Sequence, residues 1–174
     1  MSMWLKLVKA HPPFLAAVRV RPDLLDRLWY DDDPADEAGP GDVRLPDASD
    51  GRALLAAVDP ANDLLEKRLG LGGSGDVDDI VLAEFWTPEQ TWLAPAVGIG
   101  ADRLPHEFTY GPAWFHQPPE VARIADGLSA EIASAALNPG ADDPEWSYVE
   151  IARSLATFYG TAATERKAII GGLA

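Results

Sequence analysis

The apolar residues of the chain fall into short runs separated by proline, glycine and acidic residues. The run at residues 4–9 is bounded by a histidine and two prolines, a length and boundary typical of a strand. A helix is expected to begin at the proline pair 12–13, because the first helical residues need no amide donor. The leucines and the tryptophan that follow Pro22 predict a second short helix.

In the middle of the chain the pattern favours helices. A short helical run is expected at residues 52–58. Asp59 and Pro60 form a helix-start signal, and the leucines after them recur at helical spacing, which predicts a helix that ends at Gly70. The segment 87–90, Thr-Pro-Glu-Gln, has a capping threonine followed by proline and predicts another helix start.

The second half of the chain predicts both kinds of element. Strands are expected at 113–116 and 168–171, and helices over 118–137 and 145–163. Gly127 is expected to weaken or end the first of these helices. The glycines and prolines between residues 94 and 111 predict extended connections, with a turn at Gly111 and Pro112.

Helices therefore dominate the pattern, and the few strands lie far apart along the chain. Such spacing does not fit regularly alternating βαβ units. We expect a single compact α+β domain over residues 1–174, helix-dominated, with a small mixed or antiparallel sheet. The acidic stretch 31–50 is interrupted by proline and glycine, and it is expected to form a flexible loop.

Composition and charge exclude several classes of protein. The chain has 174 residues with 28 acidic and 14 basic side chains, a formal charge of −14. Binding to nucleic acid or to an anionic membrane surface needs clustered cations, so neither is expected. A membrane span and a signal peptide are also not expected, which makes the cytoplasm the expected location. The lack of cysteine excludes disulfides and thiol nucleophiles.

The negative charge is concentrated in one part of the chain. Residues 22–79 carry sixteen acidic side chains against five basic ones, which accounts for −11 of the −14. A field of one sign attracts partners of the other sign. This pattern favours a non-catalytic protein-binding module, an adaptor or an immunity-type protein, that presents an acidic surface to a basic partner. The alternative is a solvated segment that only keeps the protein soluble. The residues expected to contact the partner are Asp31, Asp32, Asp33, Asp36 and Glu37.

Aromatic residues are also concentrated, with seven of the fifteen between residues 85 and 115. Most are expected to fill the core. The alternative function is a small-molecule-binding protein or an enzyme, with a cleft among the aromatics of residues 85–116. His106 and His116 could also face one another across the turn at Gly111 and Pro112, with Glu107 as a third metal ligand, although two ordinary, partly exposed histidines are the favoured interpretation. The candidate pocket residues are His106, Glu107, Tyr110, Trp114 and His116.

The sequence carries no catalytic or cofactor motif that we recognise. The segment 70–75 fits GxGxxG, but it is expected to follow a helix rather than a strand, and aspartates come directly after it. A nucleophile elbow is missing, and three dispersed histidines are too few for a metal centre. We therefore predict no catalytic residue, metal or cofactor, and we favour a protein that is not an enzyme. The oligomeric state does not follow from the sequence.

One block of the chain resembles a known family. Residues 108–125, Phe-Thr-Tyr-Gly-Pro-Ala-Trp-Phe-His-Gln-Pro-Pro-Glu-Val-Ala-Arg-Ile-Ala, are similar to the block of the YfbM-like family in which a Tyr-Gly-Pro-Ala turn precedes a Pro-Glu-Glu-Val helix. The first residues, Met-Ser-Met, the Leu-Trp-Tyr at 28–30 and the Phe-Tyr at 158–159 are similar to other parts of that family. The family's tryptophan and histidine after the acidic loop are missing from residues 45–54. The resemblance implies a compact α+β domain found in bacteria, with no established activity.

Overall fold

A five-stranded antiparallel sheet organises the chain. The computed structural model describes residues 2–29, 54–70, 92–133 and 148–174. The strand order is β2-β1-β5-β4-β3, and every neighbouring pair is antiparallel. The strands are β1 (Ser2–Ala10), β2 (Leu64–Gly70), β3 (Asp102–Phe108), β4 (Gly111–His116) and β5 (Ala168–Leu173).

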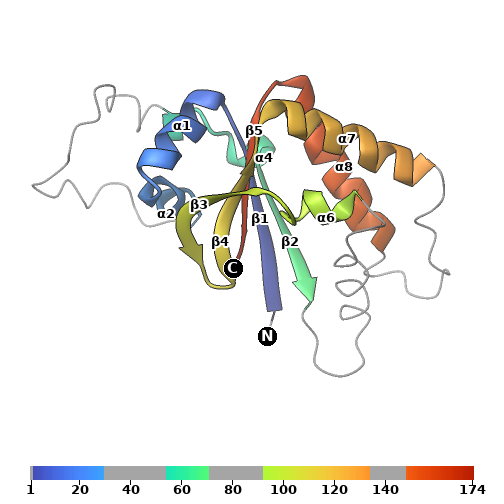
Figure 1. The fold of residues 1–174 in the computed structure, drawn as a ribbon, viewed down its shortest axis with the longest axis horizontal. Coiled ribbons are helices and arrows are strands. Elements are labelled where there is room, and N and C mark those ends of the chain that lie inside the picture. Colours follow the sequence, from blue (N-terminus) through green and yellow to red (C-terminus); the bar gives the residue numbers. More distant parts are fainter. Residues whose placement is uncertain (1, 30–53, 71–91, 134–147) are drawn as a thin grey trace, which may run out of the picture.

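Helices cover both faces of this sheet (Figure 1). On one side lie α1 and α2, drawn in blue, and on the other side lie α7 and α8, drawn in orange and red. The architecture is α+β, as the sequence predicts. The helices are α1 (Pro12–Val20), α2 (Asp23–Trp29), α4 (Pro60–Asp63), α6 (Leu93–Ala96), α7 (Pro118–Ala133) and α8 (Tyr148–Thr164).

Each face of the sheet has its own apolar core, and alternation along β1 decides which residue enters which core. Leu5 and Leu7 pack toward α7 and α8, whereas Val8 and Ala10 pack toward α1 and α2. Successive strand residues point to opposite faces, so Lys9 is directed to the same side as Leu5 and Leu7. Lys9 is only 2% exposed. A charged side chain therefore continues an apolar row.

Several predicted elements are confirmed. The strands expected at 4–9, 113–116 and 168–171 are present, as are the helices expected from residues 12 and 22 and over 145–163, the last described from Tyr148. Residues 54–56 are helical, within the run expected at 52–58. The loop expected at 31–50 and the helix start at 87–90 lie outside the described residues.

The prediction of a helix that ends at Gly70 is wrong. Asp59 does cap a helix, but α4 ends at Asp63, and the next seven residues form β2, which pairs with β1 from Ser2 opposite Gly70 to Val8 opposite Leu64. The GxGxxG segment thus begins at the end of a strand, not after a helix. The antiparallel sheet now argues against a dinucleotide site, because such sites lie in parallel βαβ units.

The extended connection predicted at 94–111 contains a strand that the sequence did not indicate. The chain forms β3, turns at residues 109–110 and enters β4 at Gly111, so the turn lies earlier than predicted. Proline interrupts strand pairing, but β3 is an edge strand and its pairing shifts register between Arg103 and Glu107, on either side of Pro105. The edge position makes Pro105 acceptable in a strand.

Gly127 does not end α7, which continues through it to Ala133. A Cβ at this position would overlap the indole ring of Trp92. The glycine therefore allows the tryptophan to lie directly against the helix backbone, and its role is close packing rather than helix termination.

Candidate functional site

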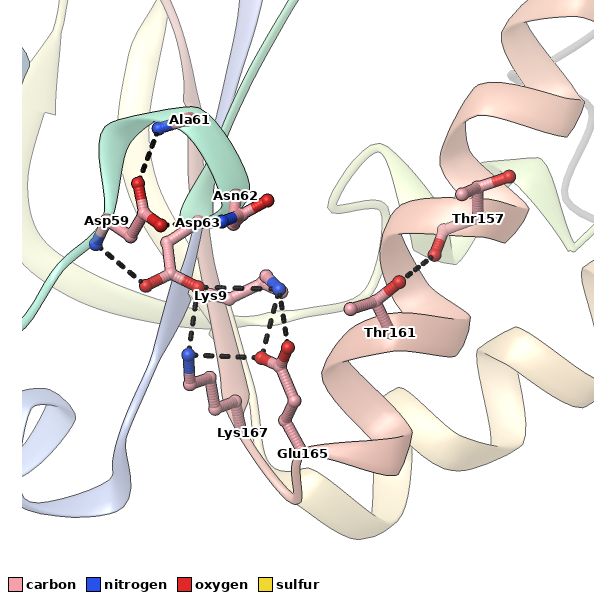
Figure 2. Close-up of polar contacts among 9 residues, drawn as sticks. All are labelled: Lys9, Asp59, Ala61, Asn62, Asp63, Thr157, Thr161, Glu165 and Lys167. Carbon is pink, nitrogen blue, oxygen red and sulfur yellow. Dashed lines mark hydrogen bonds and ion pairs between the residues drawn. The ribbon is translucent and has the colours of Figure 1, made fainter.

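Four charged side chains meet at one end of the sheet, on the side covered by α8 (Figure 2). They come from β1 (Lys9), the last residue of α4 (Asp63), and the turn between α8 and β5 (Glu165 and Lys167). The side chains of Lys9, Asp63 and Lys167 are 1%, 5% and 10% exposed, and that of Glu165 is 36% exposed. Three of the four charges are thus withdrawn from water.

The four groups form a closed ring of alternating charge, which we call the four-charge ring. Lys9 Nζ lies 3.0 and 2.9 Å from the two carboxylate oxygens of Glu165 and 3.4 Å from Asp63 Oδ1. Lys167 Nζ lies 2.8 Å from Asp63 Oδ1 and 3.0 Å from Glu165 Oε2. Each ammonium group therefore contacts both carboxylates, and the ring is formally neutral.

Local structure fixes the orientation of Asp63. The side chain of Asp59 accepts a hydrogen bond from the amide of Ala61 at the start of α4. In return, the amide of Asp59 donates to Asp63 Oδ2 at 3.0 Å. One carboxylate oxygen of Asp63 is thereby held by the backbone, and the other, Oδ1, faces the two lysines.

The turn after α8 places the other two members on either side of Arg166. The amide of Glu165 donates to the carbonyl of Thr161, and the amide of Lys167 donates to the carbonyl of Ala162. Arg166 has a φ of 55°, in the left-handed region that commonly ends helices. This reversal brings Glu165 and Lys167 back toward β1.

The pKa values of the ring reflect two opposing effects. Burial raises the pKa of Asp63, but hydrogen bonds from Lys167 and from the Asp59 amide outweigh burial, and its pKa lies below the ordinary value. Burial also acts to raise the pKa of Glu165, but hydrogen bonds from the two lysines hold this pKa below the ordinary value. Burial acts to lower the pKa of Lys167, whereas its bonds to Asp63 and Glu165 raise it overall. These three groups are charged at neutral pH.

A pocket of about 610 Å³ opens beside the four-charge ring, between α4 and α8. We call it the α4–α8 pocket. Its wall on α8 includes Ser154, Thr157 and Thr161, and its other wall includes Asn62 and Leu65. All four members of the four-charge ring also line it.

The threonines of α8 present hydrogen-bond acceptors to the pocket. Thr157 donates its hydroxyl hydrogen to the carbonyl of Arg153. Thr161 donates its hydroxyl hydrogen to the carbonyl of Thr157 (Figure 2). A hydroxyl has one hydrogen and two lone pairs, so in this arrangement each threonine oxygen can only accept from a bound molecule. The pocket thus combines charged groups with an acceptor wall.

Lys167 is suited to binding rather than to nucleophilic attack. An amine attacks only when it is deprotonated, and the raised pKa keeps Lys167 protonated. Among the described residues, no group of three metal-ligating side chains is placed to hold an ion. The paired ammonium and carboxylate groups are suited to hold a charged, hydrogen-bonding molecule.

The two histidines of the candidate pocket do not meet. His116 Nε2 lies 2.8 Å from the carbonyl oxygen of Pro95, on the α7 and α8 side of the sheet, with its ring beside Tyr159. His106 lies on the other side, with Nε2 3.4 Å from Asp26 Oδ1 of α2. The hypothesis that they face one another across the turn is therefore wrong. Burial lowers the pKa of His116, although the Pro95 carbonyl and Glu120 act in the opposite direction.

The other candidate pocket residues are also separate. Trp114 is 2% exposed and belongs to the core, where a Cβ on either Gly98 or Gly171 would overlap its ring. Glu107 is exposed on the edge strand β3, and Tyr110 is 36% exposed in the hairpin turn. The described part of the predicted aromatic cleft thus forms no shared site.

The acidic residues expected to contact a partner lie outside the described residues. The set comprises Asp31, Asp32, Asp33, Asp36 and Glu37.

Sequence reasoning missed the four-charge ring, although one signal was present. Lys9 follows Leu5 and Leu7 at a spacing of two, and Lys167 precedes Ile169 in the same way. Lys9 therefore occupies a position that points to the core side of a strand, and Lys167, one residue before the predicted strand at 168–171, continues the same alternation. A lysine at such a position needs a buried partner, which predicts paired carboxylates nearby.

Comparisons with known proteins do not assign a family. No protein-family model matches the chain, and no curated protein or solved structure matches it. The resemblance to the YfbM-like family stays a prediction from the sequence. In the parts of the chain that the structure describes, none of the helices has both the length and the apolar character needed to cross a bilayer.

Proposed function

We propose that the protein is a non-catalytic binding protein that takes a small polar molecule into the α4–α8 pocket. The observation that carries the proposal is the placement of the four-charge ring in the wall of a pocket of about 610 Å³. Small-molecule sites commonly have about this size and a few convergent polar groups. Perturbed pKa values, as at Asp63, also gather at functional sites.

Energetics support this proposal over a purely structural role. A buried ion pair gains little net stability, because the desolvation of its charges offsets their attraction. Three of the four charged side chains are at most 10% exposed, and all four residues line the pocket. Charges at a pocket wall that add little to the stability of the fold can contribute to the binding of a ligand.

Filling the pocket tests the proposal. Thr161→Phe places a large ring in the pocket, and we expect it to weaken binding of sodium gluconate or sorbitol about ten-fold or more while leaving the fold intact, since Thr161 is exposed. Thr164→Phe is the matched control, because Thr164 is also exposed on α8, makes the same bond to a carbonyl four residues earlier and does not line the pocket. Chemical-shift titration of the backbone amides measures both. Equal affinities in the two variants would contradict the proposal.

The concentrated negative charge favours a second candidate, the binding of a basic protein through the acidic surface of residues 22–79. It is supported by the balance of sixteen acidic against five basic side chains. Two acidic side chains of α2, Asp23 and Asp26, are exposed in the described part of this region. Complementary charge accelerates and orients the association of proteins.

Salt and charge removal test this candidate. We expect the affinity of the full chain for decalysine, measured by calorimetry, to fall about ten-fold or more when NaCl rises from roughly 50 to roughly 200 mM. Replacing Asp31, Asp32 and Asp33 by asparagine is expected to abolish the binding. Neutralising three exposed acidic residues outside this region, Asp102, Glu107 and Asp126, is the control for net charge. Binding that responds neither to salt nor to the aspartate changes would remove the candidate.

A further inference from the structure

The four members of the four-charge ring are not equally fixed, and this difference indicates what the pocket binds. We infer that the α4–α8 pocket takes an organic monocarboxylate that carries hydroxyl groups, and that the ligand's carboxylate replaces that of Glu165 between Lys9 and Lys167. The inference rests on the proposed function and names its ligand class.

Glu165 is the member that can leave. Its side chain is 36% exposed, compared with 5% for Asp63, and it lies in the turn after α8 rather than within a strand or helix. Asp63 is held by the amide of Asp59 as well as by the lysines. Rotation of the Glu165 side chain into water rehydrates its carboxylate, and a carboxylate of the ligand can then replace it beside the two ammonium groups.

Charge balance selects a monoanion. When Glu165 leaves, two lysines face one remaining carboxylate, and the ring carries a formal charge of +1. Lys9 is 1% exposed on its side chain, so this charge lies where an uncompensated cation is costly. A single carboxylate restores neutrality and can accept from Lys9 and Lys167 at the positions where Glu165 accepts now. A neutral molecule lacks this compensation, and a cation is repelled.

The α8 wall of the pocket selects hydroxyl groups. The hydroxyl oxygens of Thr157 and Thr161 can only accept hydrogen bonds, because their hydrogens are donated to helix carbonyls. A ligand whose carboxylate binds at the ring therefore needs hydrogen-bond donors where it reaches these threonines. Hydroxyl groups supply donors without adding a charge that would disturb the balance at the ring.

Replacing Glu165, whose carboxylate competes with that of the ligand, tests the inference. We expect Glu165→Gln to bind sodium gluconate about ten-fold or more tightly than the unchanged protein, because the ligand no longer displaces a charged group. Glu107→Gln removes one negative charge from an exposed position on β3, at the opposite edge of the sheet from β2, and is expected to leave the affinity unchanged. Sorbitol, which has the hydroxyl groups without the carboxylate, is expected to bind much more weakly to all three proteins. Calorimetry measures the affinities.

The possible outcomes separate this inference from the proposed function. If gluconate and sorbitol bind equally well, and Thr161→Phe weakens both, the pocket binds small polar molecules and the monocarboxylate assignment is wrong. If gluconate binds no more tightly to Glu165→Gln than to the unchanged protein, exchange with Glu165 is wrong. If neither compound binds, both proposals fail. Should Glu165→Gln not fold, the carbon-13 signal of the Glu165 carboxyl in the unchanged protein gives the answer: it shifts on gluconate addition if the side chain is displaced and stays in place otherwise.

Discussion

Replacing Asp63 by alanine is expected to lower the free energy of unfolding by about 3–5 kcal/mol, because it leaves two buried lysines with one carboxylate between them. The same change removes the acceptor of the Asp59 amide at the start of α4. Urea unfolding followed by far-ultraviolet circular dichroism at neutral pH measures the loss.

A paired replacement is the control for the Asp63 prediction. Removing both partners of a buried ion pair is often close to neutral, so Asp63→Leu together with Lys167→Met is expected to be more stable than Asp63→Leu alone. If the double variant loses the sum of the two single losses, the charges are not coupled and the prediction is wrong.

The effect of Asp63 also has a defined dependence on pH. Its pKa is lowered in the folded protein, so its contribution is fully present above the ordinary aspartate pKa, near pH 4, and is lost as the pH falls through the folded value. The stability difference between the unchanged protein and Asp63→Ala should therefore shrink below about pH 4. A difference that stays constant into strong acid would show that the charge of Asp63 is not what stabilises the fold.

Gly98→Ala is expected to cost about 3 kcal/mol, the sum of a left-handed backbone penalty and of overpacking against an aromatic ring. Gly98 has a φ of 93°, and a Cβ there would overlap the indole of the buried Trp114. The ring cannot move away easily, since Gly171 lies against it as well. Thermal or urea unfolding of the variant measures the cost.

Gly100 offers a matched control for Gly98. It also has a positive φ, of 77°, but a Cβ there meets nothing within 4 Å. Gly100→Ala is therefore expected to show only the backbone penalty, about 1 kcal/mol. If the two alanine variants were equally stable, contact with Trp114 would not explain the glycine at position 98.

The parts of the fold that the sequence predicts are those whose pattern is set locally. Proline pairs and apolar spacing are enough to predict α1 and the start of α7, because helix starts depend on near neighbours. The prediction for β2 is wrong because its structure depends on distant residues. Most residues of β2 are good helix formers, and pairing with β1 is what makes this segment a strand. β3 was missed because Pro105 is compatible with a strand only at a sheet edge, which the sequence does not reveal.

The candidate site was harder to predict than the fold. Lys9 and Glu165 are 156 positions apart, and Lys167 and Asp63 are 104 apart, so their meeting depends on strand order and register. The alternation of residues at Lys9 and before β5 at Lys167 indicates that both lysines face the core, but it does not indicate which carboxylates reach them. The concentration of aromatic residues predicted a pocket at Trp114, but this side chain packs between the backbones of two glycines in the core.

The position of β5 also constrains the order in which the sheet can form. β5 lies between β1 and β4 in the described sheet, and it follows the other four strands in the chain. The two strand pairs, β1 with β2 and β3 with β4, are therefore joined only when β5 pairs with both. We expect the sheet to be completed late in folding, because β5 brings together strands that lie far apart in the sequence.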